Sequence, residues 1–286
     1  MQSHEKQVMD EQLIVGLIIE KRKIWKRGSG RNLWKSLEAD LARHHLKIGR
    51  DKFFDLLRRR GLLKHHRKRK ITTTDSYHRY HKYPNLIKEK IPLKANEIWV
   101  SDITYIHLSE ADEFCYLFLI TDLYSRKIIG YCVHPTLHAK GAVISLQMAL
   151  KQRQESDSKD CIHHSDRGVQ YCCDAYVQLL NKNGITISMT ENSDPLENAV
   201  AERINKTIKE EFTDDKEISF KDLQQARQEL KKFIEFYNKE RRHRSIDWLT
   251  PNEAHQRQGE LKRQWKMYYR KQKGELGRHT ATELLV

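Results

Sequence analysis

The sequence contains no long apolar run. None of its 286 residues lies in a stretch that approaches the roughly 18 consecutive apolar residues of a membrane-spanning helix. The first residues, MQSHEKQVMDEQ, are polar and lack the apolar segment of a secretory signal. These two absences predict a cytoplasmic protein without a membrane partner.

Cysteine is scarce, and its spacing does not suggest a metal site. The five cysteines are an odd number and include no C-x-x-C pair, which argues against a disulfide framework and a zinc knuckle. The adjacent Cys172 and Cys173 are interpreted as partly buried packing residues. No zinc is expected.

Positive charge is abundant but unevenly distributed within the net charge of +14. Residues 1–97 contain 25 Lys and Arg against 11 Asp and Glu, and residues 256–286 contain 8 against 3. Residues 98–255 have the opposite balance, 20 against 25. An acidic centre between basic arms is typical of an enzyme that grips a polyanion, so nucleic acid is the predicted partner. The simpler interpretation is charge that only keeps the protein soluble.

Residues 1–63 are predicted to form a small all-α domain. Apolar residues recur at helical spacing in residues 11–25 and 31–45, and RDKFFDLLRRRG adds a basic amphipathic helix after a turn. Two short helices joined by a tight turn are typical of a helix-turn-helix DNA reader, although a plain helical bundle has the same pattern. The candidate DNA contacts are Arg50, Lys52, Arg58 and Arg59.

Residues 64–97 are interpreted as a basic extended linker because they show no clear periodicity. They begin with KHHRKRK, a block that is solvated in most proteins but could lie along phosphates between two DNA-facing units. Residues 256–286 form a second basic segment, which could contact DNA, contact another subunit or be a loosely ordered helix. The candidate DNA contacts in the linker are Arg67, Lys68 and Arg69.

Residues 98–255 are predicted to form an α/β domain. Three strand-like segments come first, and helices and strands then alternate, which fits a mixed sheet with helices on its faces. Strand ends in such a sheet are the expected place for an active site. The predicted strands cover residues 98–106, 114–122, 127–133, 161–166 and 185–189, and the predicted helices cover residues 139–153, 170–183, 195–212 and 219–237.

The helix over residues 195–212 has a well-defined start and two distinct faces. Asp194 and Glu197 have the spacing of a capping box, and Pro195 stands at the first helical position. At 100° per residue, one face is apolar and the opposite face is polar. The apolar face contains Leu196, Val200, Ile204, Ile208 and Phe212.

Glu202 lies on the polar face of this helix, together with Lys206 and Lys209. An exposed Glu paired with Lys one turn later is ordinary on a helix surface. Two aspartates change that interpretation. Asp102 interrupts an otherwise apolar strand, where a lone carboxylate needs a partner or a metal ion, and Asp166 ends a short strand, although HSDRG could also be a simple turn.

Three carboxylates that converge would suit hard divalent cations, which prefer oxygen ligands. Two such ions can activate the attacking oxygen and stabilise the leaving oxygen in phosphodiester chemistry. Asp102, Asp166 and Glu202 are therefore the candidate catalytic and metal-binding residues.

The same three residues carry a resemblance to a known family. With 35 residues between Asp166 and Glu202, they match the Asp-Asp-Glu triad of retroviral-type integrases and transposases. More narrowly, HSDRGVQY, ITISMT, ENAVAERINKTIKEEF and FIEFYNKERRHRSIDWLTPNEAH resemble the transposase encoded by the second reading frame of insertion sequences of the IS-three family. Residues 31–63 also resemble that family's helix-turn-helix segment, so the resemblance covers nearly the whole chain.

The resemblance implies a ribonuclease-H-like core whose triad holds two Mg²⁺ ions, with Mn²⁺ as a possible substitute. It implies metal-dependent cleavage at the ends of an element and transfer of the 3′-OH into target DNA, through a circular intermediate and in a dimer or higher synaptic oligomer. The implied DNA partners are the terminal inverted repeats and the target. By similarity, the DNA end is contacted by Lys206, Lys209 and Asn198, of which Asn198 is expected on the same face as Glu202.

Two features of the sequence depart from related patterns. The family usually has Pro after the first Arg of a YNxxRPH motif, whereas this chain has Arg242 there, which leaves the local turn uncertain. The Cys/His zinc module of retroviral integrases is absent, since no cysteine precedes Cys115. Two other functions fit the same residues, namely a non-catalytic end-binding regulator and a structure-selective nuclease.

Overall fold

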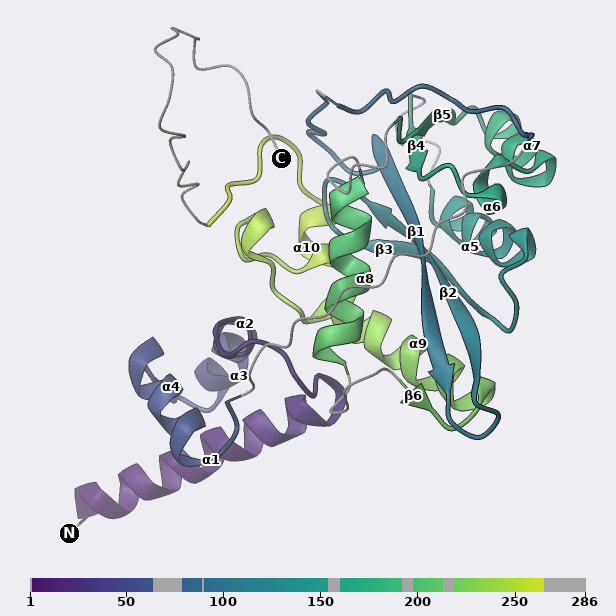
Figure 1. The fold of residues 1–286 in the computed structure, drawn as a ribbon. Helices are drawn as coiled ribbons and strands as arrows, with labels where there is room; N and C mark the ends of the chain where they lie inside the picture. The colour runs from purple at the N-terminus through teal and green to yellow at the C-terminus, as the bar shows by residue number, and fades with distance from the viewer. Residues whose placement is uncertain are drawn as a thin grey trace, which may run out of the picture.

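A computed structural model describes residues 2–63, 79–88, 90–153, 160–191, 198–212 and 219–264 of the chain (Figure 1). The N-terminal part is helical, and the remainder is a mixed sheet with helices on both faces. Both parts of the predicted fold class, the all-α region and the α/β core, are therefore confirmed.

The N-terminal region contains a long helix followed by three short ones. The residues predicted as one helix over 31–45 form two, because the chain turns at the fully buried Leu37. The last two helices, joined by residues 44–49, have the predicted helix-turn-helix order. The helices are α1 (Gln2–Ile24), α2 (Gly30–Ser36), α3 (Glu38–Arg43) and α4 (Arg50–Arg59).

The sheet has the strand order β3-β2-β1-β4-β5, and a short β6 also pairs with β1. The first three strands are antiparallel neighbours, whereas β4 and β6 pair with β1, and β5 pairs with β4, in parallel. This arrangement places the long first strand at the centre of a mixed sheet. The strands are β1 (Ile98–Leu108), β2 (Glu113–Asp122), β3 (Ile128–His134), β4 (Ile162–Ser165), β5 (Thr186–Met189) and β6 (Ser219–Phe220).

Two hydrophobic clusters fill the two faces of the sheet. On one face, α5 and α7 bury residues such as Leu146 and Leu180 against Phe118. On the other face, α8 and α9 contribute Ile208 and Phe233 to a cluster that continues into α1, α2 and α4. The helices of the core are α5 (Ala139–Gln152), α6 (Val169–Cys172), α7 (Asp174–Lys182), α8 (Ala199–Glu211), α9 (Leu223–Lys239) and α10 (Pro251–His255).

Two helix predictions need correction or stay open. The single helix predicted over residues 170–183 is wrong in detail, because Cys173 is extended (φ −68°, ψ 150°) and separates α6 from α7. The described part of α8 begins after Asn198, whose side chain makes no capping hydrogen bond. The predicted capping box of Asp194 and Glu197, with Pro195, lies outside the described residues.

The two-faced character of α8 is confirmed. Ile204, Ile208 and Phe212 are at most 4% exposed, whereas Glu202 and Lys206 face solvent. The helix therefore uses its apolar side to cover β1 and presents its polar side outward.

The described parts of the linker and of the C-terminal segment lie against the core. Within the described residues 79–88 and 90–97 no helix or strand forms, but Pro84 accepts a hydrogen bond from Met189 of the edge strand β5 (3.2 Å). Further along, Lys94 pairs with Gln258 as an isolated bridge, and the Gly259 amide donates to the Leu93 carbonyl (2.7 Å). In the described part of the chain, no helix is both long and apolar enough to cross a membrane.

Candidate active site

Asp102 and Asp166 occupy corresponding positions on neighbouring parallel strands. The β1–β4 register pairs Ile98 with Ile162 and Val100 with His164. Continuing that register by two residues sets Asp102 opposite Asp166, just beyond the last residue of β4. Asp102 lies within the long β1, and Asp166 directly follows the shorter β4, so the two carboxylates neighbour each other where β4 ends. The end of a parallel strand is the kind of position where ligands bind.

Asp166 starts a tight turn. Its Oδ1 accepts a hydrogen bond from the Gly168 amide at 3.0 Å, so it also has the turn-forming role that its sequence context allowed. A β-carbon added at Gly168 would lie 3.0 Å from that same oxygen. Glycine therefore lets the backbone approach the carboxylate closely and keeps Asp166 folded over the turn.

The three acidic residues interact electrostatically. The pKa of Asp102 is raised to about 7, first because the carboxyl is desolvated and second because of the nearby charge of Asp166. The charge of Glu202 acts in the same direction. The strand β1, the turn after β4 and the helix α8 thus bring the three predicted residues close enough for their charges to interact.

These carboxylates fit a hard cation by their chemistry, but they are not closed around one. All three offer only oxygen atoms, and like charges that raise the pKa of Asp102 are what a divalent cation would neutralise. Among the residues that the structure describes, no three His, Cys, Asp or Glu side chains are close enough to hold an ion. Metal binding by Asp102, Asp166 and Glu202 therefore remains a prediction.

Asn205 is a site residue that the sequence interpretation missed. Its Nδ2 donates to Asp102 Oδ2 at 2.7 Å, although the residue is only 6% exposed. This hydrogen bond lowers the pKa of Asp102 and opposes the effect of desolvation. The sequence did offer a signal for Asn205. It lies one turn after Glu202 and, at 100° per residue, 180° from Leu196, which is where the apolar face ends.

Asn198 was expected on the exposed face beside Glu202, and that expectation is wrong. The residue is 6% exposed, and its Nδ2 donates to the backbone carbonyl of Ser101 at 2.9 Å. At 200° from Leu196 on the helical wheel, Asn198 is close to the direction of Asn205. Both amides therefore attach α8 to β1, on either side of the peptide that carries Asp102.

Lys206 and Lys209 lie on the outer side of α8, as predicted. Lys206 forms an ion pair with Glu210 at 3.6 Å. The pKa of Lys209 is lowered because its ammonium group is partly desolvated, while the charge of Asp102 acts in the opposite direction. Lys209 is therefore within electrostatic range of Asp102. A DNA contact by either lysine remains a prediction.

The two histidines before Asp166 are buried and serve packing. His163 Nε2 lies 2.7 Å from Ser101 Oγ and 2.8 Å from the Tyr176 hydroxyl. Burial, helped by the neighbouring His164, lowers the pKa of His163 to about 3, so its ring is neutral. His164 Nδ1 lies 2.8 Å from Ser188 Oγ. These contacts are those of packed core side chains with hydrogen-bond partners.

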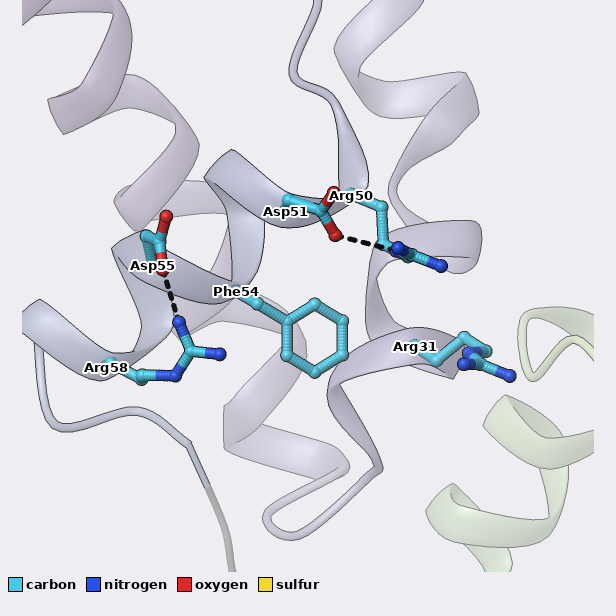
Figure 2. A pocket seen from close by; sticks show the side chains of 6 residues that line it. All are labelled: Arg31, Arg50, Asp51, Phe54, Asp55 and Arg58. Atoms are coloured by element: carbon cyan, nitrogen blue, oxygen red, sulfur yellow. Dashed lines mark hydrogen bonds and ion pairs between the residues drawn. The ribbon is translucent and has the colours of Figure 1, made fainter.

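Two of the candidate DNA contacts of the helical region, Arg50 and Arg58, line an open pocket of about 410 Å³ between α2 and α4. Arg50 pairs with Asp51 at 2.9 Å, and Arg58 pairs with Asp55. Figure 2 shows both pairs beside the ring of Phe54. The pocket is lined by Arg31, Arg50, Asp51, Phe54, Asp55 and Arg58.

The other candidate contacts have different surroundings. Arg59 forms an ion pair with Glu11 of α1 at 2.9 Å, which draws it toward that helix. Lys52 is exposed on α4. Arg67, Lys68 and Arg69 lie outside the described residues. DNA contact by any of them remains a prediction.

The Arg241-Arg242-His243 segment, where the sequence departs from its motif, forms a defined turn. Arg242 donates to the Trp248 carbonyl at 3.0 Å, and the His243 amide donates to the Leu249 carbonyl at 3.0 Å. Arg241 turns inward and pairs with Glu211 at 2.7 Å. The turn therefore forms without proline.

Comparisons with known proteins agree with this geometry. Residues 92–195 and residues 183–251 each match an integrase core domain. The 31 kDa protein of insertion element IS600 from Shigella sonnei is 32% identical over 220 residues, which cover 76% of this chain and 78% of that protein. The transposase for insertion sequence element IS904 from Lactococcus lactis is 33% identical over 172 residues, covering 59% and 66%.

Two further similarities complete the comparison. Transposase InsF for insertion sequence IS3A from Escherichia coli is 32% identical over 159 residues, covering 55% of this chain and 53% of the relative. The HTLV-2 integrase catalytic core domain, solved in complex with magnesium, is 14% identical with a TM-score of 0.42, covering 58% of this chain and 99% of that chain.

The mixed sheet, with Asp102 within β1 and Asp166 just after β4, together with the domain matches, defines an integrase core. The sequence identity to the insertion-element relatives, and the share of the chain that they cover, show which family of integrase-core proteins this chain is in. The chain belongs to the insertion-sequence transposases of the IS-three family.

Proposed function

We propose that this transposase cuts DNA at the ends of its insertion sequence and transfers the freed 3′-OH to a phosphodiester of target DNA. The observation that carries the proposal is the β1–β4 register, which leads Asp102 of β1 toward Asp166 just after β4, together with Glu202 on α8, whose charge acts on Asp102. Both reactions are in-line displacements at phosphorus and require no covalent intermediate with the protein.

Asp102, Asp166 and Glu202 would hold the divalent cations, with Mg²⁺ as the expected ion and Mn²⁺ as a substitute. Bound there, such ions stabilise the charge on the attacking and leaving oxygens of a phosphodiester displacement. Since the described carboxylates are not closed around an ion, we expect their final approach to accompany binding of cation and DNA.

Other side chains of α8 would orient this centre and the DNA. Asn205 holds Asp102 by a hydrogen bond and favours its ionised form, which is the form that binds cations. Lys206 and Lys209 lie on the outer side of the same helix, where they would contact phosphates of the DNA end. The net charge of +14 supports an extended DNA interface that involves the basic N-terminal and C-terminal segments.

The DNA partners would be the terminal inverted repeats of the element and the target. Joining two ends requires that both are held together, so we propose a dimer or higher oligomer as the active form.

Strand transfer with pre-cleaved end oligonucleotides and Mg²⁺ tests the proposal. We expect the wild type to join the ends to a target, and Asp166→Asn to abolish joining while end binding in a gel-shift assay persists. A mutant that still joins ends would refute the role of Asp166. An inactive wild type that binds ends would indicate a regulator, and cleavage of branched DNA without joining would indicate a nuclease.

A further inference from the structure

Glu211, the last residue of α8, joins three distant parts of the chain. Its carboxylate accepts hydrogen bonds from Trp25 Nε1 (2.7 Å) and from both Nε and Nη2 of Arg241 (2.8 and 2.7 Å). Its backbone carbonyl accepts a fourth from the Arg27 amide at 2.8 Å. The helix that carries Glu202 is therefore fastened at its far end to the segment that follows α1.

The contact is buried and tightly packed. The side chains of Arg241 and Glu211 are 6% and 13% exposed, and Trp25 is fully buried. The guanidinium carbon of Arg241 lies 5.7 Å from the centre of the Trp25 ring. A β-carbon added at Gly28 would overlap that ring, so glycine lets the chain pass directly over it. A bidentate pair in such surroundings has one geometry and little freedom.

A second attachment joins α1 and α2 to the C-terminal end of α9. Lys21 of α1 pairs with Glu240, the residue after α9, at 2.6 Å, and with Asp40 at 3.2 Å. Ser36 of α2 donates its hydroxyl hydrogen to the Glu240 carbonyl at 3.1 Å. One hydrophobic cluster runs through both attachments and includes residues of α4 as well as of α8 and α9.

Two separate attachments prevent the helical region from pivoting on the core. The helix α4, which carries the candidate base-reading residues, is thus set at a fixed distance and orientation from Asp102, Asp166 and Glu202. Figure 1 shows the end of α1 near the end of α8, on the side opposite α5 to α7.

We infer that the junction of Trp25, Glu211 and Arg241, with Lys21 and Glu240, determines which phosphodiester is cut by fixing the spacing between α4 and the triad. The inference rests on the proposed function. One nucleotide step along B-DNA is about 3.4 Å, so a displacement of that size between the two parts would move the cut by one position.

The test loosens the junction without removing the buried ion pair, because loss of either charge could unfold the protein. Trp25→Phe deletes one hydrogen-bond donor and keeps an aromatic ring. Lys21→Met deletes both ion pairs of the second attachment and leaves its Ser36 hydrogen bond, and the double variant combines the two changes. The matched control is Trp99→Phe. Trp99 is equally buried and donates its indole N–H to Asn96 (3.0 Å), but it lies within the core.

Full-length proteins are incubated with labelled end duplexes and Mg²⁺, and the cut sites are read at nucleotide resolution. A second set of duplexes carries one or two extra base pairs between the terminal nucleotides and the inner part of the terminal inverted repeat, called the internal repeat below. We expect the wild type and Trp99→Phe to cut at one position that keeps its distance from the internal repeat. We expect the double variant to cut at several adjacent positions, with end binding and thermal unfolding confirming that it is folded.

A double variant that binds ends, cuts them and keeps the single wild-type position would overturn the inference. A Trp99→Phe variant that spreads its cuts equally would do the same, because general loosening would then explain the effect. A wild type that cuts no ends would instead contradict the proposed function.

Discussion

Replacing Asp102 by Asn is expected to stabilise the folded protein when no divalent cation is present. The pKa of Asp102 is about 7, compared with an ordinary value of 3.8, so the folded state binds a proton that the unfolded state has already released. Each pH unit of this difference corresponds to 1.36 kcal/mol, which gives about 4 kcal/mol as an upper limit for the cost of ionising Asp102 in the folded state. Allowing for solvent screening at a half-buried side chain, we expect a gain of about 1–3 kcal/mol.

The sign of the effect defines a pH window. Because the folded-state pKa is raised, the wild type loses stability as the pH rises from about 3.8 to about 7. The substituted asparagine has no charge to titrate, and its carbonyl can still accept from Asn205, so the variant should lack this loss. The gain should therefore be largest above pH 7 and should vanish toward pH 4.

Urea unfolding in EDTA at a series of pH values measures this difference. The control is Asp122→Asn, since Asp122 is fully buried but well supplied with donors: its carboxylate accepts from Ser125 (N, 2.7 Å; Oγ, 2.6 Å) and from the Asn96 amide (2.8 Å). The Asp122→Asn substitution should destabilise the folded protein at every pH, because the new side-chain NH₂ group would face the hydrogen-bond donors that now bind the carboxylate. If Asp102→Asn is neutral or destabilising at pH 8, or if its gain is independent of pH, the charge repulsion inferred for this site is wrong.

Two further expectations follow from single contacts. Asn205→Ala removes a hydrogen bond to a charged acceptor, which is worth about 1.5–3 kcal/mol. In an NMR titration with EDTA this should raise the pKa of Asp102 by about one to two pH units, whereas Asn198→Ala should leave that pKa unchanged. Equal changes in the two variants would contradict the specific role of Asn205. Arg241→Ala leaves a buried carboxylate without its ion-pair partner and should lower the free energy of unfolding by about 3–5 kcal/mol, measured with urea, and a loss below about 1 kcal/mol would show that the pair is effectively solvated.

Periodicity in the sequence was enough to predict most elements of the core. The strands and long helices contain strong apolar patterns, and the two faces of α8 follow directly from the spacing of Ile204 and Ile208. The breaks at Leu37 and Cys173 were missed because neither residue is a helix breaker. Leu37 is fully buried and Cys173 packs partly buried against the core, so packing rather than local preference ends the helices there.

The site was predictable as a set of acids but not as an arrangement. Asp102 and Asp166 stood out because carboxylates at apolar strands need a reason. That they lie opposite each other depends on the β1–β4 register, which joins residues 64 positions apart (Ile98 with Ile162). Asn205 and Asn198 look alike in the sequence, and only the position of β1 beneath α8 gives one the carboxylate of Asp102 and the other a backbone carbonyl.

The pairing of Lys94 with Gln258 bears on how a shorter form of the protein could be made and how the chain folds. A fragment limited to residues 98–255 would lose both partners, and also the hydrogen bond from the Tyr124 hydroxyl to the Gly259 carbonyl (2.9 Å). Residues 93–264 are the smaller unit that retains these ties. Because the whole catalytic sheet separates the two partners in sequence, their contact closes a very long loop and should form late. Protection of the Gly259 amide from hydrogen exchange would then report that the core has finished folding.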